Sequence, residues 1–496
     1  MNCKSCAATR GKTASARRTV QILTPAILYS LVSLFCCFGL ADNRPTPRKT
    51  NGTEFSVSLP KKIRPLPEGV LAKGATPGFK FRGIKGWGWT AEQYLAVIPV
   101  MAQYKMNFLM NCYSSMEDQA EPGASRGTSY RPNHWYRPLP EAKKRAYEQV
   151  VRECQHRGIQ FCFSMNPNLH SDRSFDYNDP GDLEILWTHY AWMQSLGVRW
   201  FNVSLDDIKQ RVDAAGQAKL LNEFLRRLRQ KDPGAQLTFT PTWYAGPVEN
   251  EKESNPRIGN GDTASMRYTK ELAEKLNPDV YLFWTGPEEC SLTITAEDAE
   301  RYKRLSKHRL FIWDNYPVND HRPTMHLGPL TGRDPRLATV VDGYISNPQS
   351  PQVEANQIPM LTIADYLWNP GAYDPARSIG QSIAHLGRTR EQRLVLKDLV
   401  ELYPGRLVDG SHSTAWNSLR NRFRGILNEG TPGVAVNFIK AAEGVSRRMA
   451  KVFPDQFVHA RQTLDADIAG MQTEFAKKYP TYKVADFPED LRATKP

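Results

Sequence analysis

Residues 198–208 read Val-Arg-Trp-Phe-Asn-Val-Ser-Leu-Asp-Asp-Ile, a β-branched and aromatic run that ends in two adjacent carboxylates. Such a run predicts a buried β-strand from Val198 to Leu205. Similar short runs recur on both sides of it, separated by amphipathic stretches with apolar residues three and four positions apart. This alternation of strand and helix is typical of a parallel sheet.

Eight such runs can be traced. The predicted strands are Phe79–Ile84, Asn107–Cys112, Ile159–Ser164, Val198–Leu205, Gln236–Thr240, Val280–Trp284, Leu310–Trp313 and Gly343–Ser346. The helices predicted between them are Glu92–Tyr104, Glu141–Arg157, Asp182–Leu196, Gln217–Gln230 and Thr295–Leu305. Eight units over roughly 290 residues predict an α/β fold of the (β/α)8 TIM-barrel type. A doubly wound open sheet is the alternative, although no G-x-G-x-x-G follows the first strand to support a dinucleotide fold.

The rest of the chain differs in character from the barrel. After about Tyr373 strand signals end, and helical patterns broken at Pro and Gly predict an all-α domain, with Leu394, Leu396, Leu399 and Leu402 on one apolar face. The expected organisation is a signal peptide or N-terminal anchor (1–41), a linker (42–77), the barrel (78–372), the helical domain (373–480) and a flexible tail (481–496).

The pattern of the first 41 residues predicts an export signal. Five basic residues and no acid precede or flank an uncharged run from Ala26 to Leu40, followed by the small-residue pattern Gly39-Leu40-Ala41. About 15 residues is short for a membrane helix, which needs about 20. We therefore expect an exported protein, secreted or periplasmic, that contacts a membrane only if this segment stays uncleaved.

Composition narrows the function classes. The chain has 496 residues, of which 40% are apolar and 24% charged, which excludes collagen, coiled coil and wholesale disorder. The net charge of +13 is thinly spread without a basic stripe, so no nucleic-acid partner is predicted. No His-Glu-x-x-His or calcium-loop pattern occurs, and neither a metal nor another cofactor is expected.

The end of the fourth predicted strand carries the strongest chemical signal. Adjacent Asp206 and Asp207 repel one another, and this repulsion with partial burial can keep one carboxyl protonated near neutral pH, so an acid and a base coexist. A helix N-cap or a solvated surface pair is the structural alternative. Aromatic and amide residues end the later strands, in the segments 240–244, 283–287 and 313–320. Aromatic faces stack on sugar rings and amides bind hydroxyls, so this mixture suits a carbohydrate.

In these segments the chain resembles glycoside hydrolase family 84, the β-N-acetylglucosaminidases that include enzymes removing O-linked N-acetylglucosamine from proteins. The resemblance covers about Phe79 to Tyr373. Its most specific parts are Ser204–Ile208, Trp284–Pro287, Trp313–Asp320, Leu327–Pro329 with Gly332-Arg333, Ser346–Pro348 and Asp365-Tyr366.

The resemblance implies a retaining hydrolase in which the substrate's own acetamido oxygen displaces the aglycone and forms an oxazoline. It implies that Asp206 polarises the acetamido N–H, and that Asp207 protonates the departing oxygen and later activates water. The implied substrate-binding residues are Tyr244, Trp313, Asn315, Asp320, Asn347 and Trp284.

The chain departs from the family pattern at two strand ends. The second strand ends in Cys-Tyr-Ser-Ser-Met (112–116), so Ser114 stands where the family has a pocket lysine. The loop after the first strand reads Lys-Gly-Trp-Gly-Trp (85–89), where Lys85 replaces a family Glu, and we expect Lys85 to compensate in space for the missing lysine. The predicted function is an exo-acting β-N-acetylglucosaminidase on glycans or glycoproteins. The alternatives are a non-catalytic sugar-binding protein with a degenerate pocket and a hyaluronidase-like glycosaminoglycan hydrolase.

Overall fold

The computed structural model describes residues 65–71, 77–86, 88–116, 133–208, 210–246, 264–319, 324–350, 352–405 and 419–482. The predicted signal or anchor (1–41) lies outside these residues, as do most of the linker and nearly all of the tail. In the described ranges, no helix is both long and apolar enough to cross a membrane.

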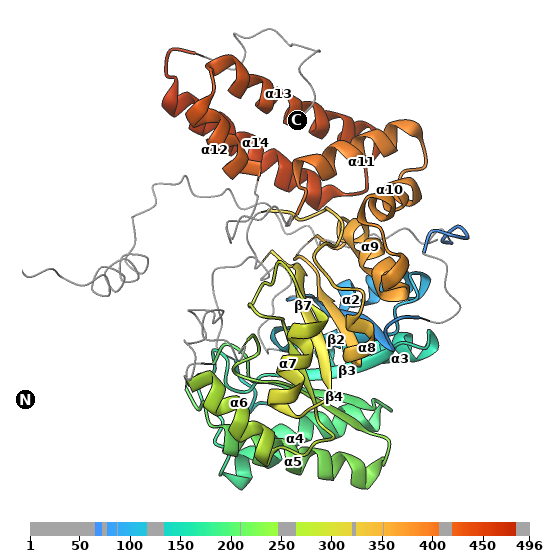
Figure 1. Ribbon diagram of the computed structural model, residues 1–496, viewed down its shortest axis with the longest axis vertical. Helices are drawn as coiled ribbons and strands as arrows, with labels where there is room; N and C mark the ends of the chain where they lie inside the picture. The colour runs from blue at the N-terminus through green and yellow to red at the C-terminus, as the bar shows by residue number, and fades with distance from the viewer. Residues whose placement is uncertain are drawn as a thin grey trace, which may run out of the picture. The chain divides into compact units, whose positions relative to one another are not determined.

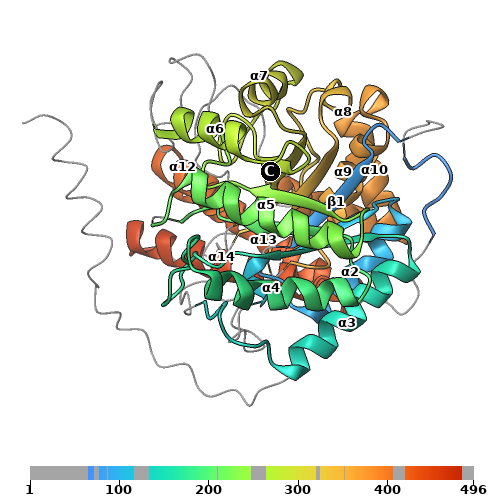
Figure 2. The same ribbon diagram turned by 90° about the horizontal axis from the view of Figure 1, so that it is seen from below.

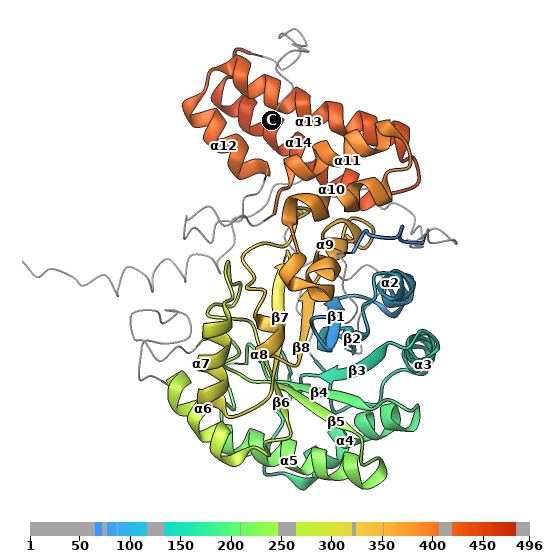
Figure 3. The same ribbon diagram turned by 45° about the vertical axis from the view of Figure 1, so that its right-hand side comes forward.

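Eight parallel strands close into a barrel, so the predicted fold is confirmed and the open-sheet alternative is wrong. β1 pairs with β2 on one side and with β8 on the other (Figure 3). The strands are β1 (Phe81–Gly86), β2 (Phe108–Asn111), β3 (Gln160–Met165), β4 (Trp200–Ser204), β5 (Gln236–Thr240), β6 (Tyr281–Trp284), β7 (Leu310–Pro317) and β8 (Gly343–Asn347). β7 continues past its predicted end at Trp313, because a bulge against β8 accommodates the polar residues that follow.

Helices follow the strands and surround the barrel, as Figure 2 shows from below. They are α2 (Ala91–Gln103), α3 (Glu141–His156), α4 (Pro180–Ser195), α5 (Ala214–Lys231), α6 (Ala264–Lys275), α7 (Ala296–Ser306), α8 (Leu337–Val340) and α9 (Gln357–Trp368). Several begin at side-chain caps, such as Thr90 before α2 and Thr295 before α7, where a capping box satisfies the first backbone N–H groups.

The two-residue period of the strands separates an inner from an outer face. On β4, Trp200, Asn202 and Ser204 share the inner face, while Phe201 packs against Tyr190 of α4, with ring centroids 6.2 Å apart. Gly83 of β1 is required by close packing, because a Cβ there would lie 1.8 Å from the carbonyl oxygen of Phe108.

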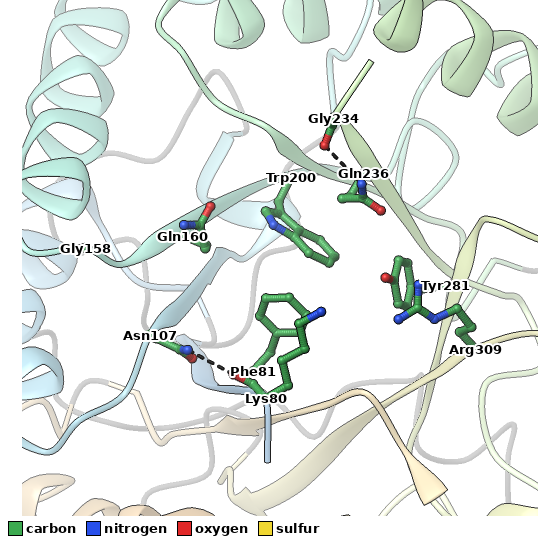
Figure 4. A pocket seen from close by; sticks show the side chains of 10 residues that line it. All are labelled: Lys80, Phe81, Asn107, Gly158, Gln160, Trp200, Gly234, Gln236, Tyr281 and Arg309. Atoms are coloured by element: carbon green, nitrogen blue, oxygen red, sulfur yellow. Dashed lines mark hydrogen bonds between the residues drawn. The ribbon is translucent and has the colours of Figure 1, made fainter. Parts of the chain in front are cut away.

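Five aromatic rings fill the amino-terminal end of the barrel. Their ring centroids lie 4.7–5.8 Å apart, and they belong to Phe81, Phe108, Trp200, Tyr281 and Phe311. A cavity of about 560 Å³ opens over this cluster (Figure 4). Its amides are used within the protein, since Asn107 donates to the Lys80 carbonyl and Gln236 to the Gly234 carbonyl, both at 3.0 Å. This cavity lies at the end of the barrel opposite the strand ends that carry the predicted site.

A second apolar core lies in the helices that follow α9, labelled in Figure 1. These helices are α10 (Pro375–Leu386), α11 (Arg390–Leu402), α12 (Leu419–Glu429), α13 (Pro432–Val452) and α14 (Val458–Lys478). This core includes Met325 and Leu327 from the segment after β7, and the Leu327 N–H donates to the Tyr403 carbonyl at 2.9 Å. The helical region therefore supports a segment that leaves the carboxyl-terminal end of the barrel.

The predicted apolar face of α11 needs one correction. Leu396, Leu399 and Leu402 are buried, but Leu394 is 47% exposed. Residues two apart lie on opposite sides of a helix, so Leu394 and Leu396 cannot share one face, and Val395 takes the inner position instead.

Leu394 and Leu396 provide a matched test of this packing. Leu396→Ala should lower the free energy of unfolding by about 2–5 kcal/mol, because it leaves a cavity in the second core. Leu394→Ala should change it by less than about 0.5 kcal/mol, as expected for an exposed site. Urea unfolding monitored by circular dichroism measures both values, and equal losses would contradict the assigned face.

Candidate active site

The predicted acid pair lies directly beyond the carboxyl-terminal end of β4. Asp206 continues the inner-face series Trp200, Asn202 and Ser204, and it is only 5% exposed, whereas Asp207 is exposed. Asp207 has φ = 59°, in the left-handed region that few residues other than glycine adopt. The two neighbouring carboxylates therefore differ in environment, one inside the barrel end and one at its surface.

Asp206 is held by groups from β2 and β3. The Tyr113 hydroxyl, in the 3-10 helix η1 (Tyr113–Met116) after β2, donates to Asp206 Oδ2 at 2.9 Å. Asn166, just after β3, donates through Nδ2 to the Asp206 carbonyl at 3.1 Å and to Oδ1 at 3.4 Å. Burial, reinforced by the charge of Asp207, raises the pKa of Asp206 to about 7.

Asp207 has its partner on the other side of β4. The Tyr244 hydroxyl, which follows β5, donates to Asp207 Oδ1 at 2.9 Å. Burial raises the pKa of Tyr244, and the charge of Asp207 adds to this effect, so the phenol stays a hydrogen-bond donor. Each carboxylate thus has a tyrosine of its own, from strands on opposite sides of β4.

A buried polar layer supports the acid pair from below. Asn202 donates to the hydroxyls of Ser164 and Ser204, both at 2.8 Å, and accepts from Thr238 at 2.9 Å. Because these side chains come from three adjacent strands, they fix the spacing of the strand ends from which the acids project.

β7 and β8 carry a second group of predicted residues. Asn315 Oδ1 accepts from Trp313 Nε1 at 3.0 Å and from Asn347 Nδ2 at 2.9 Å, and its amide donates to the Glu289 carbonyl at 2.7 Å. The register shift between Asp314 and Pro317 lies at this position, and such bulges re-aim side chains. Among the described residues, Asn347 Oδ1 is buried and has no hydrogen-bond partner.

Lys85 connects these two groups. It lies on the inner face of β1 with no exposed surface, and its Nζ is 3.7 Å from the Trp313 ring centroid and 4.9 Å from that of Tyr113. Burial lowers its pKa, while the contact with Cys112 and the charges of Asp206 and Asp207 act in the opposite direction. The ammonium group thus lies between the aromatic wall of β7 and the hydrogen-bonded pair of Tyr113 and Asp206.

The structure brings together Asp206, Asp207, Tyr244, Trp313, Asn315 and Asn347 around one end of the barrel. Trp284 is not part of this group. It is fully buried, donates to the Gly246 carbonyl at 2.9 Å and stacks on Tyr302 of α7. On β6, Trp284 lies on the outer face, as the alternation of side chains along a strand predicts. Asp320 lies outside the described residues. Sequence reasoning missed Tyr113 and Asn166, whose only signal is their place just after a strand.

No group of three or more metal-ligating side chains occurs in the part of the chain that the structure describes.

The barrel that carries this site matches a known protein family. Residues 82–401 match the model of a family described as β-N-acetylglucosaminidase. The chain belongs to this β-N-acetylglucosaminidase family. The match begins in β1 and runs through the barrel into α11, so it includes both carboxylates and the β7–β8 group. The resemblance to glycoside hydrolase family 84 is confirmed.

Curated relatives of this β-N-acetylglucosaminidase family member include the proteins named O-GlcNAcase of Mus musculus and Rattus norvegicus. Each is 23% identical over 66% of this chain, which spans 35% of the length of the relative. The chain therefore spans about a third of the curated relatives it matches.

Solved structures share the fold. CpGH84B aligns over 81% of this chain and 68% of its own, with a TM-score of 0.59 and 22% identity. A mutant O-GlcNAc hydrolase of Thermobaculum terrenum aligns over 81% of this chain and 87% of its own, with a TM-score of 0.60 and 21% identity.

A buried ion pair anchors β7 next to the site. Arg333 donates to Asp314 through Nη2 at 2.7 Å and Nε at 2.9 Å, and Tyr344 of β8 also donates to this carboxylate. The side chains of Arg333 and Asp314 are 4% and 2% exposed. Since Asp314 directly precedes Asn315, this pair holds the bulge that presents the amide group.

Arg333→Met should lower the free energy of unfolding by about 3–5 kcal/mol, because it leaves the Asp314 charge buried without its cation. The double variant Arg333→Met/Asp314→Leu should recover part of this loss. Arg309→Met removes a surface pair with Asp342 and should cost less than about 1 kcal/mol. Urea unfolding compares the three, and a loss in Arg333→Met no greater than in Arg309→Met would contradict the anchoring role.

Proposed function

We propose that this chain is a retaining exo-acting β-N-acetylglucosaminidase that releases β-linked N-acetylglucosamine from glycans or glycoproteins. The observation that carries the proposal is the acid pair at the end of β4, with a buried Asp206 and an exposed Asp207 that each accept from a separate tyrosine. Membership of the β-N-acetylglucosaminidase family supports the same reaction and substrate class.

In the proposed first step the acetamido carbonyl oxygen of the substrate attacks the anomeric carbon, and the bond to the leaving oxygen breaks. Asp207 gives its proton to that oxygen, and Asp206 accepts the acetamido N–H, so that negative charge lies beside the forming oxazolinium-like ring. In the second step water attacks the anomeric carbon and the oxazoline C–O bond breaks. Asp207 takes the proton from that water, and the two inversions give net retention.

The different environments of the acids suit these roles. Asp207 is exposed, as a group that meets the leaving aglycone and then water must be. Asp206 is buried, and in the free pocket burial favours its neutral form. A bound acetamido N–H forms a stronger hydrogen bond with a charged carboxylate than with a neutral carboxyl group, so binding favours ionised Asp206.

The β7–β8 group supplies recognition in this proposal. Trp313 and Asn347 both donate to Asn315 Oδ1, so they fix the orientation of its half-buried amide group. Tyr244 remains a donor near Asp207 and the acetamido group. A polar, uncharged ring with hydroxyls and one acetamido group matches this lining.

The position of Lys85 weakens the alternative of a non-catalytic sugar-binding protein. That alternative rests on the absence of a lysine after the second strand, yet the structure has a buried ammonium group beside the acid pair from β1. The alternative of a glycosaminoglycan hydrolase rests on the excess of positive charge, which is thinly spread. The acid pair itself does not discriminate between a neutral and an acidic aglycone. Release of a monosaccharide separates all three, because a binder releases none and an internally cleaving enzyme releases oligosaccharides.

Asp206→Asn and Asp207→Asn test the proposed roles of the two acids on two substrates, one with a poor and one with a good leaving group. Asp207→Asn should lower kcat/KM about 10²–10⁴-fold on an alkyl N-acetyl-β-glucosaminide and far less on an activated aryl one, which needs little protonation. Asp206→Asn should lower it at least about 10²-fold on both. Asp279→Asn, at an exposed surface pair, is the control and should match the parent. Equal rates in all four proteins would end the proposal.

The pH dependence of kcat/KM reports whether Asp206 and Asp207 hold one proton between them. Because the pKa of Asp206 is raised to about 7, the pair keeps one proton up to neutral pH and loses it as pH rises further. The kcat/KM for an alkyl N-acetyl-β-glucosaminide should therefore fall as pH rises through about 7, while that for an activated aryl substrate should fall less. A decline centred at the ordinary carboxyl range near pH 4 would contradict this description of the site.

A further inference from the structure

Lys85 is placed on the inner face of the barrel by β1 itself. Phe81, Gly83 and Lys85 alternate with outward residues, so the series begins in the aromatic cluster and ends at the level of the acids. Its ammonium group, with no exposed surface, lies 3.7 Å from the ring centroid of Trp313. A lysine wholly removed from water is costly, and such residues are rarely retained without a partner charge.

Tyr113 contacts both this ammonium group and the acid pair. Lys85 Nζ lies 4.9 Å from the Tyr113 ring centroid, on one side of the phenol. The hydroxyl of the same ring donates to Asp206 Oδ2 at 2.9 Å, and the residue is only 4% exposed. Two side chains, one from β1 and one from η1, thus approach Asp206 with a positive charge and with a hydroxyl donor.

Both contacts favour the same state of Asp206. A hydrogen bond donated to a carboxylate and a nearby positive charge each stabilise its ionised form, whereas burial and the neighbouring Asp207 disfavour it. Tyr244 also faces the pair but donates to Asp207, and Cys112 lies beside Lys85. Lys85 and Tyr113 therefore oppose neutralisation of Asp206 in the empty pocket, together with the longer hydrogen bond from Asn166 at 3.4 Å.

We propose that Lys85 and Tyr113 are positioning residues that favour the ionised form of Asp206 and aim it at the incoming N–H group of the 2-acetamido sugar. This inference rests on the proposed function and adds to it. Asp206 retains acceptor capacity for that N–H, because a carboxylate has about four lone-pair sites and Tyr113 and Asn166 occupy only part of them. A sugar with a 2-hydroxyl could not form the oxazoline and would use this acceptor less well.

The experiment measures N-acetylglucosamine binding by titration calorimetry as a function of pH. Affinity should rise with pH as Asp206 ionises, and Tyr113→Phe should move this transition to higher pH by about one unit, the size expected when a hydrogen bond to a charged group is lost. Lys85→Met should move it in the same direction. Tyr104→Phe removes a hydroxyl from a buried tyrosine in the α2 region, packed against His385, and should leave the transition in place.

Two outcomes separate this inference from the function on which it rests. If the parent binds no N-acetylglucosamine and hydrolyses no aryl N-acetyl-β-glucosaminide, the proposed function fails and this inference falls with it. If the parent binds the sugar but neither Tyr113→Phe nor Lys85→Met displaces the pH transition, only the positioning role is overturned. Thermal unfolding of each variant identifies any that does not fold, and the other variant then decides.

Discussion

The removal of Asp206 from water is the constraint on which the rest of the site depends. A carboxylate inside a barrel end, next to a second carboxylate, tends to become neutral, and burial accordingly raises its pKa to about 7. The neighbouring groups counter this tendency with a phenol donor, an amide donor and a buried ammonium group. Asp207, one residue further along, escapes the constraint because the backbone turns through a left-handed conformation and leaves it exposed.

The alternation of β-strand side chains connects this site to the opposite end of the barrel. One inner face runs from the aromatic cluster through the Asn202 network to the acids on β4, and another runs from Phe81 to Lys85 on β1. The barrel interior is therefore graded from aromatic to polar to charged along its axis. Around this axis, the helical region packs on the segment after β7, and the Arg333–Asp314 pair holds β7 itself.

Much of this arrangement could be predicted from the sequence. Strand and helix positions follow from local periodicity, and residues within or just after the carboxyl-terminal ends of strands 4, 5, 7 and 8 identify most of the site. The contributions of Tyr113 and Asn166 could not be predicted, because neither residue type marks a site and their role arises only when β2, β3 and β4 pair in this order in the barrel. Motif similarity predicts a place for Trp284 in the site, although its position in the strand points it outward. The apolar pattern predicts a buried Leu394, although helix geometry excludes it from the buried face. The importance of Lys85 depends on a distance across the barrel that no local pattern contains.

The central claim is that the substrate performs the displacement with its own acetamido oxygen while the protein supplies two acids in unequal environments. Hydrolysis rates for aryl β-glucosaminides with increasingly fluorinated acetamido groups test this claim most directly, since fluorine withdraws electrons from the attacking oxygen and leaves the leaving group unchanged. The account predicts that kcat falls steadily as fluorine is added. A kcat that does not respond to fluorination would show that the acetamido oxygen is not the nucleophile and would contradict the account.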